Sequence, residues 1–149
     1  MLTSIGITIE KGKVNFVVIQ GRSVDDCNII ANYNLDFNPE NIHLMEQFHN
    51  FFNEAIVKYK PNVIGYKIAS HMSLKNSQID YLYEPIGILR YLCEKNGIQT
   101  HSLSAAAIQN KKSDRIGKFK AKFDNSESEN NFNIKGKAEA GVIAWEAFK

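Results

Sequence analysis

The stretch "NVIGYKIAS", residues 62–70, places a lysine inside a segment that otherwise has the composition of a buried strand. Val63, Ile64 and Tyr66 belong to residue types that favour strands, and Pro61 with Asn62 opens the segment. Lysine is rarely buried without a partner. The segment therefore predicts a strand whose end carries a charge that needs an explanation.

The sequence on both sides of this strand alternates between two hydrophobic periods. Residues 3–10, 14–21 and 27–37 predict three strands of an antiparallel meander, and the first two are joined by a turn at "KGK", residues 11–13. A helix is predicted over 38–60, where apolar residues recur every three or four positions and Asn38 and Pro39 mark the start. The chain thus begins with a hairpin-rich half and continues with a helix and the quoted strand.

Beyond the quoted strand the pattern alternates between helices and strands. We expect a helix over 79–97 that Pro85 starts late or kinks, a strand over 98–103, a short helix over 104–112 capped by Ser104, and a closing helix over 137–148. Residues from about 110 to 135 predict a polar, flexible loop, most clearly at "DNSESENN". This order predicts an α/β fold with one mixed five-stranded sheet, in a single domain spanning 1–149.

Composition restricts the function classes more than it selects one. The chain of 149 residues is 44% hydrophobic and 23% charged, with a net charge of +2, which is too small to indicate a nucleic-acid partner by itself. Cys27 and Cys93 show no metal-binding spacing, and no apolar run approaches the ~20 residues that span a bilayer. We expect a soluble, cytoplasmic protein without a membrane partner.

The predicted order resembles the RuvC-like branch of the ribonuclease H-like superfamily, and especially its short bacterial and phage members. The stretches that carry the resemblance are "SIGITIEKGKVNFVVI", "KPNVIGYKIA", "EPIGILRYLCEKNGIQTHSLSAAAIQNKK" and "KAEAGVIAWEAF". The resemblance implies a ribonuclease H-like sheet on which four carboxylates hold two Mg²⁺ or Mn²⁺ ions. Such ions activate a water for phosphodiester hydrolysis and stabilise the leaving oxygen.

The acid positions implied by the resemblance are largely not acids in this chain. Thr8 takes the first position, Lys67 the second and Gly136 the third, whereas Glu139 keeps the fourth. Glu10 lies two residues beyond Thr8, on the same face of its strand. The resemblance then implies a pseudonuclease, a non-catalytic binding or regulatory protein that needs no cofactor, with DNA, RNA or a nucleic-acid-processing protein as partner.

Several alternatives stay open at this stage. Lys67 could extend into water, pair with Glu139 or Glu10, or contact a phosphate, and Glu139 could simply be an acid in the first turn of its helix. An active Mg²⁺- or Mn²⁺-dependent phosphodiester hydrolase would need Glu10 and Glu139 plus a further acid, Asp80 or Glu84. A third alternative is a protein-interaction module that binds no nucleic acid.

A basic run precedes the closing helix. Its cations are interleaved with Phe119 and Phe123, and they are Lys111, Lys112, Arg115, Lys118, Lys120 and Lys122. This pattern indicates either a nucleic-acid site, in which cations bind phosphates and aromatic rings stack on bases, or a solvated loop balanced by the acids downstream. His71 could reach the edge of the site or lie on the surface. Tyrosines between Tyr81 and Tyr91 favour a homodimer surface.

Overall fold

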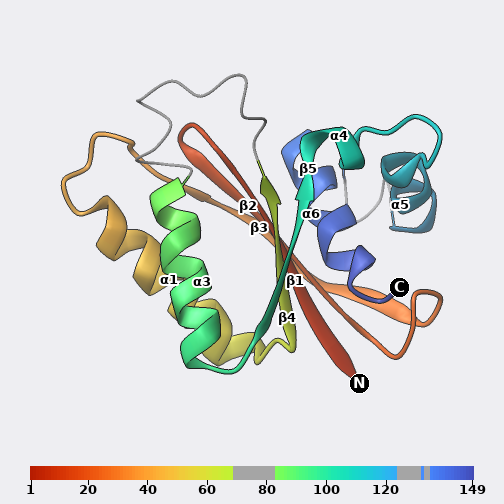
Figure 1. Ribbon diagram of the computed structural model, residues 1–149, viewed down its shortest axis with the longest axis horizontal. Coiled ribbons are helices and arrows are strands. Elements are labelled where there is room, and N and C mark those ends of the chain that lie inside the picture. Colours follow the sequence, from red (N-terminus) through yellow and green to blue (C-terminus); the bar gives the residue numbers. More distant parts are fainter. Residues whose placement is uncertain (69–82, 124–131, 133–134) are drawn as a thin grey trace.

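The computed structural model describes residues 1–68, 83–123, 132 and 135–149 of the chain. Figure 1 shows a sheet with helices packed on both faces. The strands are β1 (Leu2–Glu10), β2 (Lys13–Gly21), β3 (Cys27–Asp36), β4 (Val63–Ile68) and β5 (Gln99–Ser104). The helices are α1 (Leu44–Tyr59), α3 (Glu84–Lys95), α4 (Ala105–Ile108), α5 (Arg115–Phe123) and α6 (Lys135–Glu146). None of the helices in the described ranges is long and apolar enough to cross a membrane.

The sheet is mixed and five-stranded, in the order β3-β2-β1-β4-β5. β1, β2 and β3 pair antiparallel, whereas β4 is parallel to β1 and β5 is parallel to β4. Gly12 makes the turn between β1 and β2 with a φ of 87°, a conformation that glycine adopts without steric cost. The predicted α/β sheet, with an antiparallel meander followed by parallel strands, is confirmed.

Strand alternation divides the core into two layers. In β1, Ile5 and Ile7 point to the face covered by α1 and α3, where the larger hydrophobic cluster lies. Gly6 and Thr8 therefore point to the other face, which α6 covers (Figure 1). A Cβ on Gly6 would collide with the backbone of Ala140, so glycine here lets α6 lie directly on β1. This close approach brings the first turns of α6 to the ends of β1 and β4.

The start of one helix differs from the sequence prediction, and the start of another agrees. α1 begins at Leu44 and not at Asn38, because Asn38 and Pro39 lie in a turn in which the Asn38 side chain accepts from the Glu40 amide at 3.0 Å. α3 starts late, at Glu84 with Pro85 in its first turn, as expected. The expected helical residues 79–82 lie outside the described residues.

The expected polar loop over about 110–135 contains a helix, so the loop prediction is wrong for α5. Phe119 and Phe123 lie four residues apart, so they share one face of α5, and both are buried against α6 and its surroundings. This burial stabilises a segment whose average composition is polar. The stretch "DNSESENN", predicted to be flexible, lies outside the described residues.

Candidate functional site

The candidate site lies where the carboxyl ends of β1 and β4 meet the start of α6. Ile7 pairs with Tyr66 in the parallel register, so Thr8 and Lys67 occupy the next row of the sheet. Gly65, two residues before Lys67, lies against Ile143 of α6, so this side of β4 faces the helix. The fold therefore brings together Thr8, Lys67 and the first turns of α6. The resemblance to the RuvC-like branch implied the same grouping.

Thr8 is buried, and its hydroxyl group is fully engaged. Its Oγ1 donates a hydrogen bond to the Gly136 carbonyl at 2.8 Å and accepts one from Nδ2 of Asn15 at 3.1 Å. Asn15 lies directly opposite Thr8 in the hairpin. These two bonds tie β1, β2 and the first turn of α6 together, so Thr8 connects the sheet to the closing helix.

Lys67 forms an ion pair with Glu139. The Lys67 Nζ lies 2.8 Å from Oε2 of Glu139, and their side chains are 29% and 2% exposed respectively. The contact has the distance of an ion pair but not the angles of a hydrogen bond, so Oε2 has no hydrogen-bond donor among the described residues. The ammonium still attracts the carboxylate, because Coulomb attraction between the two charges depends little on angle. Of the interpretations of Lys67, the structure shows the pairing with Glu139.

Glu10 and Gly136 complete the cluster. Glu10 is exposed at the end of β1, and its carboxylate reaches over the first turn of α6. A Cβ on Gly136 would collide with that carboxylate and with the side-chain amide of Asn15. The three charged groups, Lys67, Glu10 and Glu139, give the cluster a formal charge of −1.

Sequence reasoning missed Asn15. It is fully buried, donates to Thr8, and leaves its Oδ1 without a hydrogen-bond partner among the described residues. The sequence does contain a signal for this residue, because Asn15 is a polar residue inside the otherwise apolar strand segment "VNFVVI". The hairpin centred on Gly12 then sets it opposite Thr8.

The residues gathered here do not fit a pair of divalent cations. Such a pair needs several free anionic oxygens, whereas this cluster offers a threonine hydroxyl, a glycine, an ammonium, a carboxylate already paired with that ammonium, and the exposed carboxylate of Glu10. Within the described ranges no three His, Cys, Asp or Glu side chains gather closely enough to hold a metal ion. Among the other candidates, Glu84 is exposed at the start of α3, and Asp80 and His71 lie outside the described residues.

Comparison with known proteins identifies the fold. No protein-family model matches the sequence, and a search of curated proteins finds no match. Thermus thermophilus RuvC in complex with a Holliday junction substrate is similar over 97% of this chain and 91% of its own, with a TM-score of 0.75 and 11% identity. The chain has the RuvC-like form of the ribonuclease H-like fold. A second structure of Thermus thermophilus RuvC gives a TM-score of 0.70 at 11% identity, covering 97% of this chain and 92% of that one. The yeast mitochondrial Holliday junction resolvase gives 0.64 at 16% identity, covering 97% and 78%.

On this RuvC-like fold, two of the six cations in the basic run are held by the protein itself. Lys122 donates to the backbone carbonyl of Asp25 at 2.9 Å. Arg115 contacts the Glu146 carboxylate at 3.2 Å and donates to the Ala107 carbonyl at 2.9 Å. Arg115 and Lys122 therefore stabilise the packing around α5. Of the remaining cations, three are exposed, namely Lys111, Lys112 and Lys118, and Lys120 is half-buried.

The two aromatic residues of the basic run belong to the core of the RuvC-like fold. Phe119 is completely buried and lies 4.8 Å, centroid to centroid, from Phe132. Phe123 packs edge-on against Trp145 at 5.7 Å. The interpretation that these rings stack on nucleic-acid bases is therefore wrong, because both side chains are buried among other aromatic residues.

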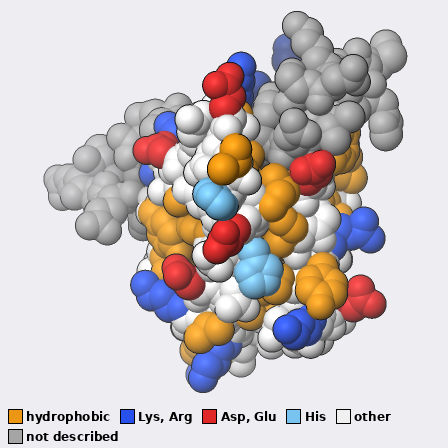
Figure 2. Space-filling model, turned by 90° about the vertical axis from the view of Figure 1, so that its left-hand side faces the viewer, with side chains coloured by type: hydrophobic (Ala, Val, Ile, Leu, Met, Phe, Trp, Pro, Cys, Tyr) orange, Lys and Arg blue, Asp and Glu red, His pale blue; other side chains and the backbone are white. Residues whose placement is uncertain are grey.

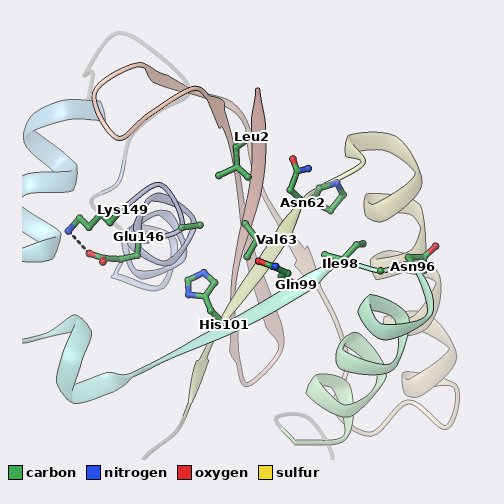
Figure 3. Close-up of a pocket in the computed structure, with 12 residues that line it drawn as sticks. Leu2, Asn62, Val63, Asn96, Ile98, Gln99, His101, Glu146 and Lys149 are labelled. Carbon is green, nitrogen blue, oxygen red and sulfur yellow. Dashed lines mark hydrogen bonds and ion pairs between the residues drawn. The ribbon is translucent and has the colours of Figure 1, made fainter.

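The RuvC-like fold also has a hollow at the opposite end of the sheet. This cavity of about 610 Å³ lies between the amino ends of β4 and β5 and the last residues of the chain (Figure 3). Burial lowers the pKa of His101 there, while the Glu146 carboxylate and a hydrogen bond with the Ile143 backbone oppose that shift. The Nε2 of His101 is buried without a partner among the described residues, against Gly65.

Proposed function

We propose that this chain is a non-catalytic RuvC-fold protein that binds nucleic acid and whose acid site is closed by the Lys67–Glu139 ion pair. The observation that carries the proposal is the 2.8 Å contact between the lysine ammonium and the buried glutamate. The ammonium supplies the positive charge that a metal ion would otherwise bring to this carboxylate. A divalent cation bound at Glu139 would have to displace the ammonium or lie beside it, at a Coulomb cost in either case.

Support for a nucleic-acid partner comes from the placement of the free lysines. α4 follows directly from the carboxyl end of β5. Lys111 and Lys112, just beyond α4, therefore lie toward the same end of the sheet as Thr8 and Lys67. Lys118 is exposed on the neighbouring α5. These lysines can neutralise phosphates, and each such contact makes the affinity depend on salt, whereas the small net charge of +2 gives little long-range attraction and therefore a low affinity.

The first experiment is a cleavage assay with four-way junctions and single strands of DNA and RNA. The four-way junction is included because a structural neighbour was solved with a Holliday junction substrate. We expect no cleavage in Mg²⁺ or Mn²⁺, either by the natural chain or by a Glu139→Ala variant. Metal-dependent cleavage that disappears in Glu139→Ala would show an active nuclease with a relocated acid set and refute the proposal.

The second experiment measures junction binding between 25 and about 200 mM salt. Each phosphate contact contributes about 0.9 to the slope of log K against log salt, so Lys112→Ala with Lys118→Ala should reduce the slope by about 1.8. Lys58→Ala with Lys95→Ala makes the same change in net charge on the other face of the sheet and should leave the slope nearly unchanged. A flat salt dependence of the natural chain would instead indicate a protein-interaction module.

A homodimer and a nucleic-acid-processing protein as partner stay predictions. Tyr91 is 60% exposed on α3 and Val57 is 66% exposed on α1. Figure 2 shows the face that α1 and α3 form, on which hydrophobic side chains are interspersed with acidic and basic ones. Sedimentation of the natural chain and of Tyr91→Ser at several concentrations measures whether this face self-associates.

A further inference from the structure

A groove runs between α3 and the outer strand of the sheet. Its volume is about 490 Å³, and one wall is helical while the other is the free edge of β5. It is lined by Gly87, Arg90, Tyr91, Glu94, Ile98 and Thr100. A groove between a helix and a sheet edge is one of the recurring places where proteins bind an extended peptide.

The backbone of β5 has hydrogen-bonding groups on its outer side, beginning at Thr100 in the groove. The amide of Gln99 donates to the Asn62 carbonyl at 3.2 Å, so the backbone groups of Gln99 point toward β4. Strand alternation then points the N–H and C=O of Thr100 and Ser102 away from β4. Between Gln99 and Ser104 there is no lysine, proline or glycine, and the register with β4 is unbroken. Within the described residues, this strand therefore lacks the lysine, proline or bulge that often prevents the addition of another strand.

The helical wall gives this groove chemical specificity. Arg90 and Glu94 are exposed one turn apart on α3, and neither forms an ion pair with another described residue. Tyr91, 60% exposed, lies between them along the helix. A Cβ on Gly87 would have no atom within 4 Å, so the groove is open at the end of α3 nearest its first turn.

We infer that this groove binds an extended peptide as a sixth strand beside β5, with one acidic and one basic residue two positions apart. Four residues of helix rise about 6 Å, and two residues of strand rise about 6.6–6.8 Å. The acid of such a peptide can therefore face Arg90 while its base faces Glu94, and an apolar neighbour can fill the space next to Gly87. The face is separate from the lysines after α4, so this inference does not depend on nucleic-acid binding.

The test uses two capped peptides of reversed charge order, Thr-Val-Glu-Val-Lys-Val-Thr and Thr-Val-Lys-Val-Glu-Val-Thr, measured by NMR titration. For a strand that adds to β5 in one fixed direction, one order should bind about 5–10-fold more tightly, since reversal then exchanges two attractive surface pairs for two repulsive ones. The variant with Arg90→Glu and Glu94→Arg exchanges the two wall charges and should invert the preference. N-methylation of the backbone amides that face β5 should abolish binding of the preferred peptide.

Gly87→Leu provides a block that does not threaten the fold. Leucine favours helix more than glycine, and the space at this position is open, so the melting temperature should not fall. Binding of the preferred peptide should be lost. The inference is overturned if neither peptide binds at millimolar concentration, or if the charge-exchanged variant keeps the original preference. It is also overturned if the natural chain forms a dimer that Gly87→Leu dissociates, because the groove would then be a contact between two copies.

Discussion

The Lys67→Met variant tests whether the ion pair is part of the packed core. Methionine keeps an unbranched apolar side chain similar to the lysine stem and removes only the charge. Glu139 is 2% exposed and has no hydrogen-bond donor on Oε2 among the described residues, so the variant leaves a buried carboxylate without a cation. The carboxylate cannot turn toward water without movement of the first turns of α6.

The magnitude follows from the burial of the two partners. Removing one partner of a fully buried pair costs about 3–5 kcal/mol, and the 29% exposure of Lys67 lets water approach, which reduces the expected cost to about 2–3 kcal/mol. For a chain of this length that corresponds to a fall in melting temperature of about 4–12 °C. Glu139→Gln should cost less, about 0.5–1.5 kcal/mol, since the freed ammonium can reach solvent.

Urea unfolding of the natural chain, both single variants and the double variant measures the coupling between the two residues. The double variant should be more stable than Lys67→Met, with a coupling energy of at least about 1 kcal/mol. Lys95→Met removes an exposed lysine at the end of α3 and serves as the matched control, with a change within about 0.5 kcal/mol. If Lys67→Met resembles this control, or if Glu139→Gln costs more than Lys67→Met, the assignment of a closed, buried pair is refuted.

Two further changes test neighbouring features of the same layer. Thr8→Val leaves the Gly136 carbonyl and the Asn15 amide without partners and should destabilise by about 2–4 kcal/mol in urea unfolding, whereas Thr8→Ser should retain most of the stability because it keeps the hydroxyl. Burial lowers the pKa of His101 in the folded chain, against an opposing contribution from Glu146, so the unfolded chain takes up the proton first as the pH falls. Stability should therefore decrease as the pH falls below about 6.5, and His101→Gln should show a smaller loss between pH 7.5 and 5.5.

The sheet was predictable because its strands and helices differ clearly in hydrophobic period. The buried strands β1, β2 and β4 and the amphipathic α1 carry patterns that suffice without tertiary information. α5 was missed, because its stability depends on burial of Phe119 and Phe123 against a helix that follows it in sequence. Local composition cannot contain that contact, and a lysine-rich segment with two isolated phenylalanines is equally typical of a loop.

The candidate site was predictable as a set of positions but not as a set of contacts. The predicted strand order places Thr8, Lys67 and the start of the last helix at one edge, and the structure places them there. Which acid pairs with Lys67 depends on how closely α6 approaches the sheet. That distance is set by Gly6 and Gly65, whose missing side chains matter only when the opposing helix is known. The sequence therefore left several partners for Lys67 open.

The contacts at this end of the sheet depend on one another, so we expect a carboxylate introduced at one position to disturb its neighbours. Lys67→Glu would place a second carboxylate beside buried Glu139 without a cation, and the two charges would repel in a poorly solvated region. Gly136→Asp would bring its side chain into collision with Asn15, which is buried and cannot move aside. Thr8→Asp would remove the donor to the Gly136 carbonyl and add a further negative charge. We therefore expect each of these single changes to destabilise the fold, in line with a structural role for the Lys67–Glu139 ion pair.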